Sequence, residues 1–168
     1  MSRVPSPRAK VALLDNLFEH LEEERSRIDT CLTRLPEDVL WRRPRPGVNS
    51  IGNLCLHLWG NESHYLGHGV GGTDFRRDRA AEFTADGGPS SQELRAKLLQ
   101  AREATRGILA GLDEGDLGGL VDVNHPEEPT VLRVILHVVT HYSYHTGQIV
   151  HLTRVYQTAD GRVLEWGH

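Results

Sequence analysis

The sequence contains few cysteines, and this scarcity excludes one class of protein. Cys31 and Cys55 are the two cysteines among 168 residues, which is too few for the disulfide framework of a small secreted domain. Both lie in stretches whose apolar residues recur at helical spacing, where a small thiol packs well in a core. We therefore expect two reduced, buried cysteines.

An excess of positive charge and a long apolar run are also missing. The formal net charge is -4, so no basic field attracts nucleic acid or an anionic membrane surface. No stretch approaches the roughly 20 apolar residues that a membrane-spanning helix needs. The N-terminal sequence MSRVPSPRAK lacks the apolar run of a signal peptide. We expect a cytoplasmic protein that binds neither nucleic acid nor membrane.

Apolar residues recur at helical spacing along most of the chain. This pattern predicts four long helices in one all-α domain covering residues 1–168, a length that suits a single core. Ser90 and Thr130 can cap the third and fourth helices with their hydroxyl groups. The expected helices cover residues 8–35, 51–68, 91–112 and 131–156.

The connection between the second and third helices is unusually long. Residues 69–90 hold five glycines, a proline and many charges, which predicts a loop without a regular element. At about 3.3 Å per extended residue, this segment could cross a whole bundle and start the third helix parallel to the second. We therefore expect a four-helix bundle with up-down-down-up topology and a long crossover.

Three of the ten histidines recur at intervals of four in the last predicted helix. His137, His141 and His145 therefore share one side of that helix, with neighbouring rings about 6 Å apart along the axis. Two adjacent imidazoles at this spacing can share a metal ion, but the outer two are about 12 Å apart and cannot. A third ligand must come from another helix.

The second predicted helix carries histidines and asparagines on an arc that borders its apolar face. This arc is either a solvated surface or the wall of a wet pocket. His57 and His64 are about 10.5 Å apart along the axis, so at most one of them joins the pair on the last helix. Parallel helices would place His57 level with His137 or His141, whereas antiparallel helices would place it level with His141 or His145. The long crossover favours the antiparallel arrangement.

Two stretches around these histidines, NSIGNLCLHLWGNE and HVVTHYSYHTGQI, resemble the DinB-like (DinB/YfiT-like) family. The segment FRRDRAAEF resembles the crossover of one subgroup, so the resemblance covers most of residues 49–154. In that family a four-helix bundle binds a divalent metal through one histidine of the second helix and an HxxxH pair of the fourth. The resemblance implies that His57, His141 and His145 bind a divalent metal. Three imidazoles suit zinc, nickel and other first-row metals, and we expect zinc or nickel. His137 is an extra histidine relative to the family pattern, and we expect it to pack or hydrogen-bond beside the three ligands.

The family resemblance also implies a reaction class. Some relatives are transferases that use a low-molecular-weight thiol of the bacillithiol, mycothiol or glutathione type, and a metal at three neutral imidazoles can hold such a thiol as its thiolate. We expect a metal-dependent S-transferase that joins the thiol to an electrophile and forms a homodimer. Arg76, Arg77 and Arg79 are candidates to bind the carboxylates of the thiol cofactor, although arginines in a crossover are commonly solvated.

Two alternatives stay open at this stage. A metal-dependent hydrolase would need a carboxylate near the ion to act as a general base, and none stands out among the helical neighbours of the three histidines. Glu62, one turn beyond His57, has no evident role, so the sequence identifies no catalytic residue. The second alternative is a stress-associated metal-binding dimer without turnover.

Overall fold

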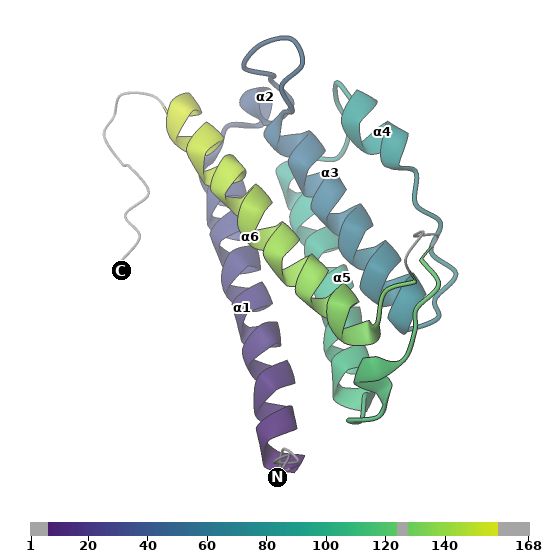
Figure 1. Cartoon of the computed structure of the whole chain (residues 1–168). Coiled ribbons are helices and arrows are strands. Elements are labelled where there is room, and N and C mark those ends of the chain that lie inside the picture. The colour runs from purple at the N-terminus through teal and green to yellow at the C-terminus, as the bar shows by residue number, and fades with distance from the viewer. Residues whose placement is uncertain (1–6, 124–127, 158–168) are drawn as a thin grey trace.

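The computed structural model describes residues 7–123 and 128–157, and these residues are predominantly helical (Figure 1). No β-strand forms within these two ranges, which confirms the predicted all-α class. The longer helices are joined by short helical turns. The elements are α1 (Pro7–Arg34), α2 (Glu37–Leu40), α3 (Ile51–Glu62), the π-helical η1 (Ser63–Val70) that continues α3, α4 (Arg79–Thr84), α5 (Ser91–Gly111), the 3-10 helix η2 (Asp116–Gly118) and α6 (Val131–Tyr156).

The four long helices α1, α3, α5 and α6 lie side by side (Figure 1). Helix α1 packs against α5 and α6, and α3 packs against the same two helices from the other side. His57 of α3 lies beside His141. Asn61, one turn later, lies beside His137, one turn earlier on α6. Helices α3 and α6 therefore run in opposite directions.

Side-chain caps begin three of the long helices where the sequence predicts. Ser50 and Asn53 form a capping box at the start of α3, and Ser90 and Glu93 form another at the start of α5. The hydroxyl of Thr130 accepts a hydrogen bond from the backbone N–H of the third residue of α6. These bonds satisfy backbone donors that the first helical turn leaves without partners. The predicted starts of these helices are confirmed.

The prediction of a loop without regular structure over residues 69–90 is wrong in one respect. The segment contains the six-residue helix α4, whose first turn is capped by the Asp78 side chain. A helix this short is unstable alone and shows no useful periodicity, so packing decides whether it forms. Here α3 supplies that packing, because the amide of Asn53 donates hydrogen bonds to the carbonyls of Glu82 and Ala85 at 3.0 and 2.8 Å.

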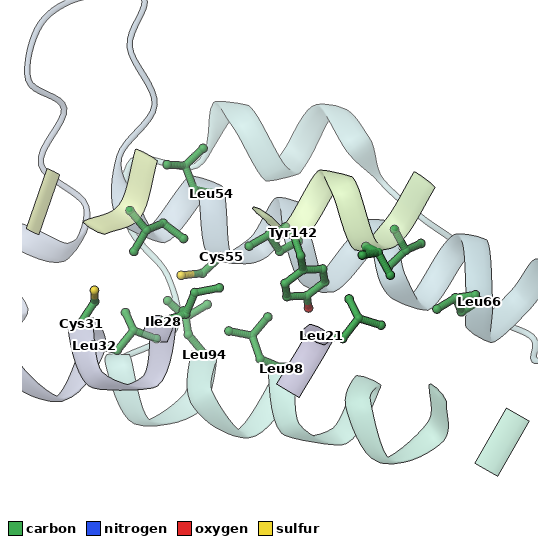
Figure 2. Packing of buried hydrophobic residues seen from close by; sticks show 14 of the residues in the cluster. Leu21, Ile28, Cys31, Leu32, Leu54, Cys55, Leu66, Leu94, Leu98 and Tyr142 are labelled. Carbon is green, nitrogen blue, oxygen red and sulfur yellow. The ribbon is translucent and has the colours of Figure 1, made fainter. Parts of the chain in front are cut away.

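The core between the long helices is aliphatic. Figure 2 shows leucine, isoleucine and cysteine side chains of α1, α3 and α5 meeting around Tyr142 of α6. Cys31 and Cys55 are both free and fully buried, as predicted. Burial raises the pKa of both thiols, so neither is a thiolate at neutral pH. Among the described helices, none is both long and apolar enough to cross a bilayer.

Candidate metal centre

Three histidines meet between α3 and α6. His57 comes from α3, while His141 and His145 come from successive turns of α6. Their ring centroids are 4.7 Å apart for His57 and His141, 5.0 Å for His57 and His145, and 4.5 Å for His141 and His145. One candidate ligand atom from each ring lies within 4.8 Å of the others. The three side chains could therefore hold a metal ion.

Hydrogen bonds on the outer side of two rings leave the inner nitrogens available. His57 Nδ1 lies 2.8 Å from Oε2 of Glu82, and His145 Nδ1 lies 2.8 Å from Oε1 of Gln148. An imidazole whose Nδ1–H donates to such an acceptor keeps its lone pair on Nε2, which is the usual arrangement of a metal-binding histidine. Nε2 of His57 lies 3.0 Å from Nε2 of His141, a spacing at which two ring nitrogens share a proton or a cation. The residues fit a divalent metal.

The surroundings favour neutral imidazoles. Burial, together with the neighbouring His145 ring, lowers the pKa of His141 to about 3. Burial also lowers the pKa of His145. Nδ1 of His141 is buried and has no hydrogen-bond partner among the described residues. Because only the neutral ring offers a lone pair, His141 and His145 are both ready to bind a cation near pH 7.

Glu82 belongs to this centre, and sequence reasoning missed it. The residue is 5% exposed, and Arg77 donates two hydrogen bonds to its carboxylate, from Nε to Oε1 at 2.6 Å and from Nη2 to Oε2 at 2.8 Å. Burial alone would raise the pKa of Glu82, but the hydrogen bonds from His57 and Arg77 outweigh burial and hold that pKa below its ordinary value. Glu82 lies 25 residues from His57 in a segment predicted as loop, so no spacing rule connects the two.

The three arginines of the crossover lie in different surroundings. Arg77 is bound to Glu82, so its Nε and Nη2 are occupied. Arg76 is almost fully exposed and lies 3.8 Å from Asp74, while the Arg79 guanidinium lies 5.1 Å from the ring centroid of a phenylalanine. The binding of thiol carboxylates by these arginines stays a prediction.

The remaining histidines near the centre lie outside the triad. His137 is exposed, its Nε2 lies 3.3 Å from the Asn61 amide nitrogen, and its ring stacks 5.4 Å from that of His141. This is the neighbouring role predicted for it. His64 and His68 on η1 bond to backbone carbonyls, at 3.3 and 2.6 Å. None of these three rings joins the cluster that could hold a metal.

Glu62, whose role the sequence left open, has a full set of partners away from the triad. Its oxygens accept hydrogen bonds from Arg102 at 2.9 and 3.2 Å, from the Thr105 hydroxyl at 2.7 Å and from the Tyr142 hydroxyl at 2.6 Å. The carboxylate is fully buried. It therefore joins α3 to α5 and α6 and is not placed to take a proton at the triad.

A pocket of about 490 Å³ lies beside two neighbours of His145, although no triad histidine lines it. It lies between residues 47–49 and α6, with Leu54 and Leu152 among the apolar side chains that line it. Two other lining residues contact a triad histidine: Gln148 bonds His145, and the Tyr144 ring lies 4.9 Å from that imidazole. The volume is within the usual range for small-molecule sites.

Comparison with known proteins places the chain in a family. A model of the DinB superfamily matches residues 20–149. None of the curated proteins is significantly similar to the chain in sequence. A DinB-like protein from Bacillus cereus has a TM-score of 0.66 at 17% identity, covering 84% of this chain and 91% of its own. A DinB-like protein from Bacillus subtilis has a TM-score of 0.65 at 17% identity, covering 86% and 94%.

A third solved structure extends the likeness. A conserved protein from Enterococcus faecalis has a TM-score of 0.64 at 16% identity, covering 84% of this chain and 95% of its own. At these identities the likeness to the three structures concerns the fold, whereas the family model matches most of the sequence. The chain belongs to the DinB superfamily.

Proposed function

We propose that this protein is a metal-dependent S-transferase that joins a low-molecular-weight thiol, of the bacillithiol, mycothiol or glutathione type, to an electrophile. His57, His141 and His145 are the proposed ligands of a zinc or nickel ion. The observation that carries the proposal is the convergence of three imidazoles from two antiparallel helices, two of them hydrogen-bonded on the outer nitrogen. An all-imidazole site is typical of catalytic rather than structural metals.

The chemistry follows from the charge of such a site. Three neutral ligands leave the positive charge of a divalent ion intact and a position open, so a bound ion would lower the pKa of a thiol there. In the reaction the thiol would release its proton to solvent, its sulfur would bond to the electrophilic carbon, and the bond to the leaving group would break, so that the group departs with the bonding electron pair as an anion. Gln148 bonds the outer nitrogen of His145 and so fixes the orientation of that ring. The pocket beside Tyr144 and Gln148 would receive the electrophile, and its side chains Leu54 and Leu152 offer it an apolar surface.

The surroundings favour thiol transfer over hydrolysis. A metal-dependent hydrolase needs a carboxylate free to take a proton from water at the ion. Glu82 bonds the outer nitrogen of His57, and Glu62 is saturated by three other side chains. Neither of these two buried carboxylates, on α3 and α4, is therefore free to act as the general base. A hydrolase and a non-catalytic metal-binding dimer are the alternative outcomes of the tests below.

We also propose that the four long helices form an up-down-down-up bundle and that two copies associate as a homodimer. The opposite directions of α3 and α6 support the topology, and so does the long connection that leads back to α4 and α5 (Figure 1). Light scattering after size-exclusion chromatography measures the oligomeric state.

Arg76 and Arg79 are exposed and lie on either side of Arg77, the crossover arginine that bonds Glu82. We assign Arg76 and Arg79 to the carboxylates of the thiol.

Metal content tests the site directly. Protein purified without an affinity tag should contain about one equivalent of zinc or nickel by elemental analysis. Replacing His57, His141 or His145 by alanine should remove most of it. The matched control is His137→Ala, which deletes a histidine on the same helix one turn from the triad and should keep the metal. Stoichiometric metal in all three triad variants would refute the site.

Turnover tests the reaction class. The metal-loaded protein is mixed with 1-chloro-2,4-dinitrobenzene and, in separate samples, with bacillithiol, mycothiol or glutathione. Thiol-dependent conjugation that disappears in the metal-free triad variants supports the transferase. Turnover of ester or amide substrates without any thiol would favour the hydrolase instead. Bound metal with no turnover in any sample would favour the non-catalytic dimer.

A further inference from the structure

Glu82 reaches the triad from the crossover rather than from the long helices that carry the histidines. It lies on α4, is 5% exposed, and its Oε2 lies 2.8 Å from Nδ1 of His57. Arg77 bonds both of its oxygens. Burying a carboxylate costs free energy of desolvation unless it is paired and hydrogen-bonded, so these contacts are a specific feature of the fold and not a chance surface contact.

The carboxylate decides which nitrogen of His57 carries the proton. An ionised carboxylate only accepts hydrogen bonds, and a bare Nδ1 would place two lone pairs 2.8 Å apart. Nδ1 of His57 must therefore donate, and in the neutral ring the lone pair then resides on Nε2. This is the nitrogen that lies 3.0 Å from Nε2 of His141. The Arg77 Nη2 also lies 3.0 Å from Nδ1. Because a guanidinium only donates, it could bond Nδ1 only in the other tautomer, which the carboxylate oxygen 2.8 Å from Nδ1 disfavours.

Residues outside the crossover also hold Glu82 in this place. Gly60, one turn after Leu56 on α3, faces the carboxylate, and a Cβ built there would collide with Oε1 of Glu82. Arg43 donates a hydrogen bond at 2.7 Å to the carbonyl of Phe83, whose ring packs 4.6 Å from that of His57. Contacts to the Phe83 carbonyl, to the Phe83 ring and to the Glu82 carboxylate thus hold the short helix α4 in place.

The two triad histidines of α6 differ from His57 in this respect. His145 is held by Gln148, a neutral amide, and Nδ1 of His141 has no partner among the described residues. His57 is thus the triad member held by a charged acceptor. An anionic partner increases the basicity of the opposite nitrogen more than a neutral one does.

We infer that Glu82 is a positioning residue of the metal centre, which holds His57 as its Nδ1–H tautomer and directs Nε2 toward the ion, with Arg77 holding the carboxylate. The inference rests on the proposed metal site. It makes the crossover part of the centre, although no crossover residue is a ligand. Loss of such a partner typically weakens metal binding about 10- to 100-fold.

Glu82→Gln tests the inference through zinc affinity, measured by competition with a chromogenic chelator. The amide offers one acceptor oxygen where Arg77 and His57 together present three N–H groups, so the support of His57 is lost or shared. We expect zinc binding about 10- to 100-fold weaker than in the wild type. Glu82→Asp keeps the charge on a shorter side chain and should recover part of the loss.

The matched control is Glu93→Gln. It removes a carboxylate that caps α5 and bonds Ser90, with no contact to a histidine, and it should leave zinc affinity unchanged. Circular dichroism and a thermal melt establish that each variant is folded. A folded Glu82→Gln variant that binds zinc within twofold of the wild type would overturn the inference.

A measurement on the wild-type protein covers the case in which Glu82→Gln does not fold. Nitrogen-15 NMR of the zinc-loaded protein with labelled histidine should show His57 protonated at Nδ1 and bound through Nε2. Ligation through Nδ1 would overturn the inference while leaving the metal site intact. A wild-type protein that binds no zinc or nickel would instead refute the proposed function, so the two failures are distinguishable.

Discussion

Glu62 accepts hydrogen bonds from three side chains of α5 and α6, whereas Glu82 on α4 bonds one histidine and one arginine. Both carboxylates are buried and both are paired with an arginine. The side chains that bond Glu62 do not connect it to the triad. Tyr142 donates its hydroxyl proton to the carboxylate, and burial together with the charge of Glu62 raises the pKa of that tyrosine, so it stays a neutral donor. The partner of Glu82, by contrast, has a second nitrogen in the triad.

This difference shows that burial and charge alone do not mark a functional residue. Glu62 and Glu82 share residue type, depth and an arginine partner, and they differ in what lies beyond that first contact. Glu62 joins three helices, which is a contribution to stability. Glu82 acts on His57, whose other side faces the place where an ion would bind. Variants should therefore separate stability from metal affinity.

The largest effect on stability is expected for Glu62→Gln. The change leaves Arg102 buried without its full counter-charge, and breaking a buried ion pair on one side typically costs about 3 to 5 kcal/mol of the free energy of unfolding. Urea denaturation measures the loss. Zinc affinity of the folded fraction should match the wild type, because Glu62 has no bond to the triad. A parallel fall in zinc affinity would contradict the division between the two carboxylates.

Gly60→Ala should give a smaller loss of stability but affect the metal centre. The new methyl group collides with Glu82, and such overpacking typically costs about 1 to 3 kcal/mol. Zinc affinity should fall because Glu82 is displaced from His57. Gly107→Ala on α5 is the control: nothing lies near its Cβ, and it should stabilise the helix by about 0.5 to 1 kcal/mol. Equal behaviour of the two variants would refute the close fit at Gly60.

The smallest effect on stability is expected at a carboxylate–arginine pair on the surface. Asp29 and Arg95 join α1 to α5 through bonds of 2.7 and 3.1 Å, but both side chains are partly exposed. Solvent screens such a pair, so Asp29→Asn should change the free energy of unfolding by at most about 1 kcal/mol. Urea denaturation measures it. A loss as large as that of Glu62→Gln would mean that pairing, rather than burial, sets the cost.

Much of the fold could be predicted because its signals are local. The four long helices follow from apolar spacing, and the caps at Ser90 and Thr130 follow from one side chain meeting a backbone N–H three residues later. The pairing of His141 with His145 follows from one helical turn. His57 needed more: its place as third member depended on helix direction and on a family resemblance, and the structure does bring it to that pair.

The parts that depend on contacts between distant residues could not be predicted in this way. Glu82 meets His57 across 25 residues, and Glu62 meets Tyr142 across 80. From the sequence, Gly60 is a residue of low helix propensity inside a helix. Only the packing shows that its missing side chain leaves room for the Glu82 carboxylate. Periodicity reports which face a residue occupies within its own helix, because that depends on local geometry. Which side chain lies opposite depends on how separate elements dock, and that is a property of the assembled molecule.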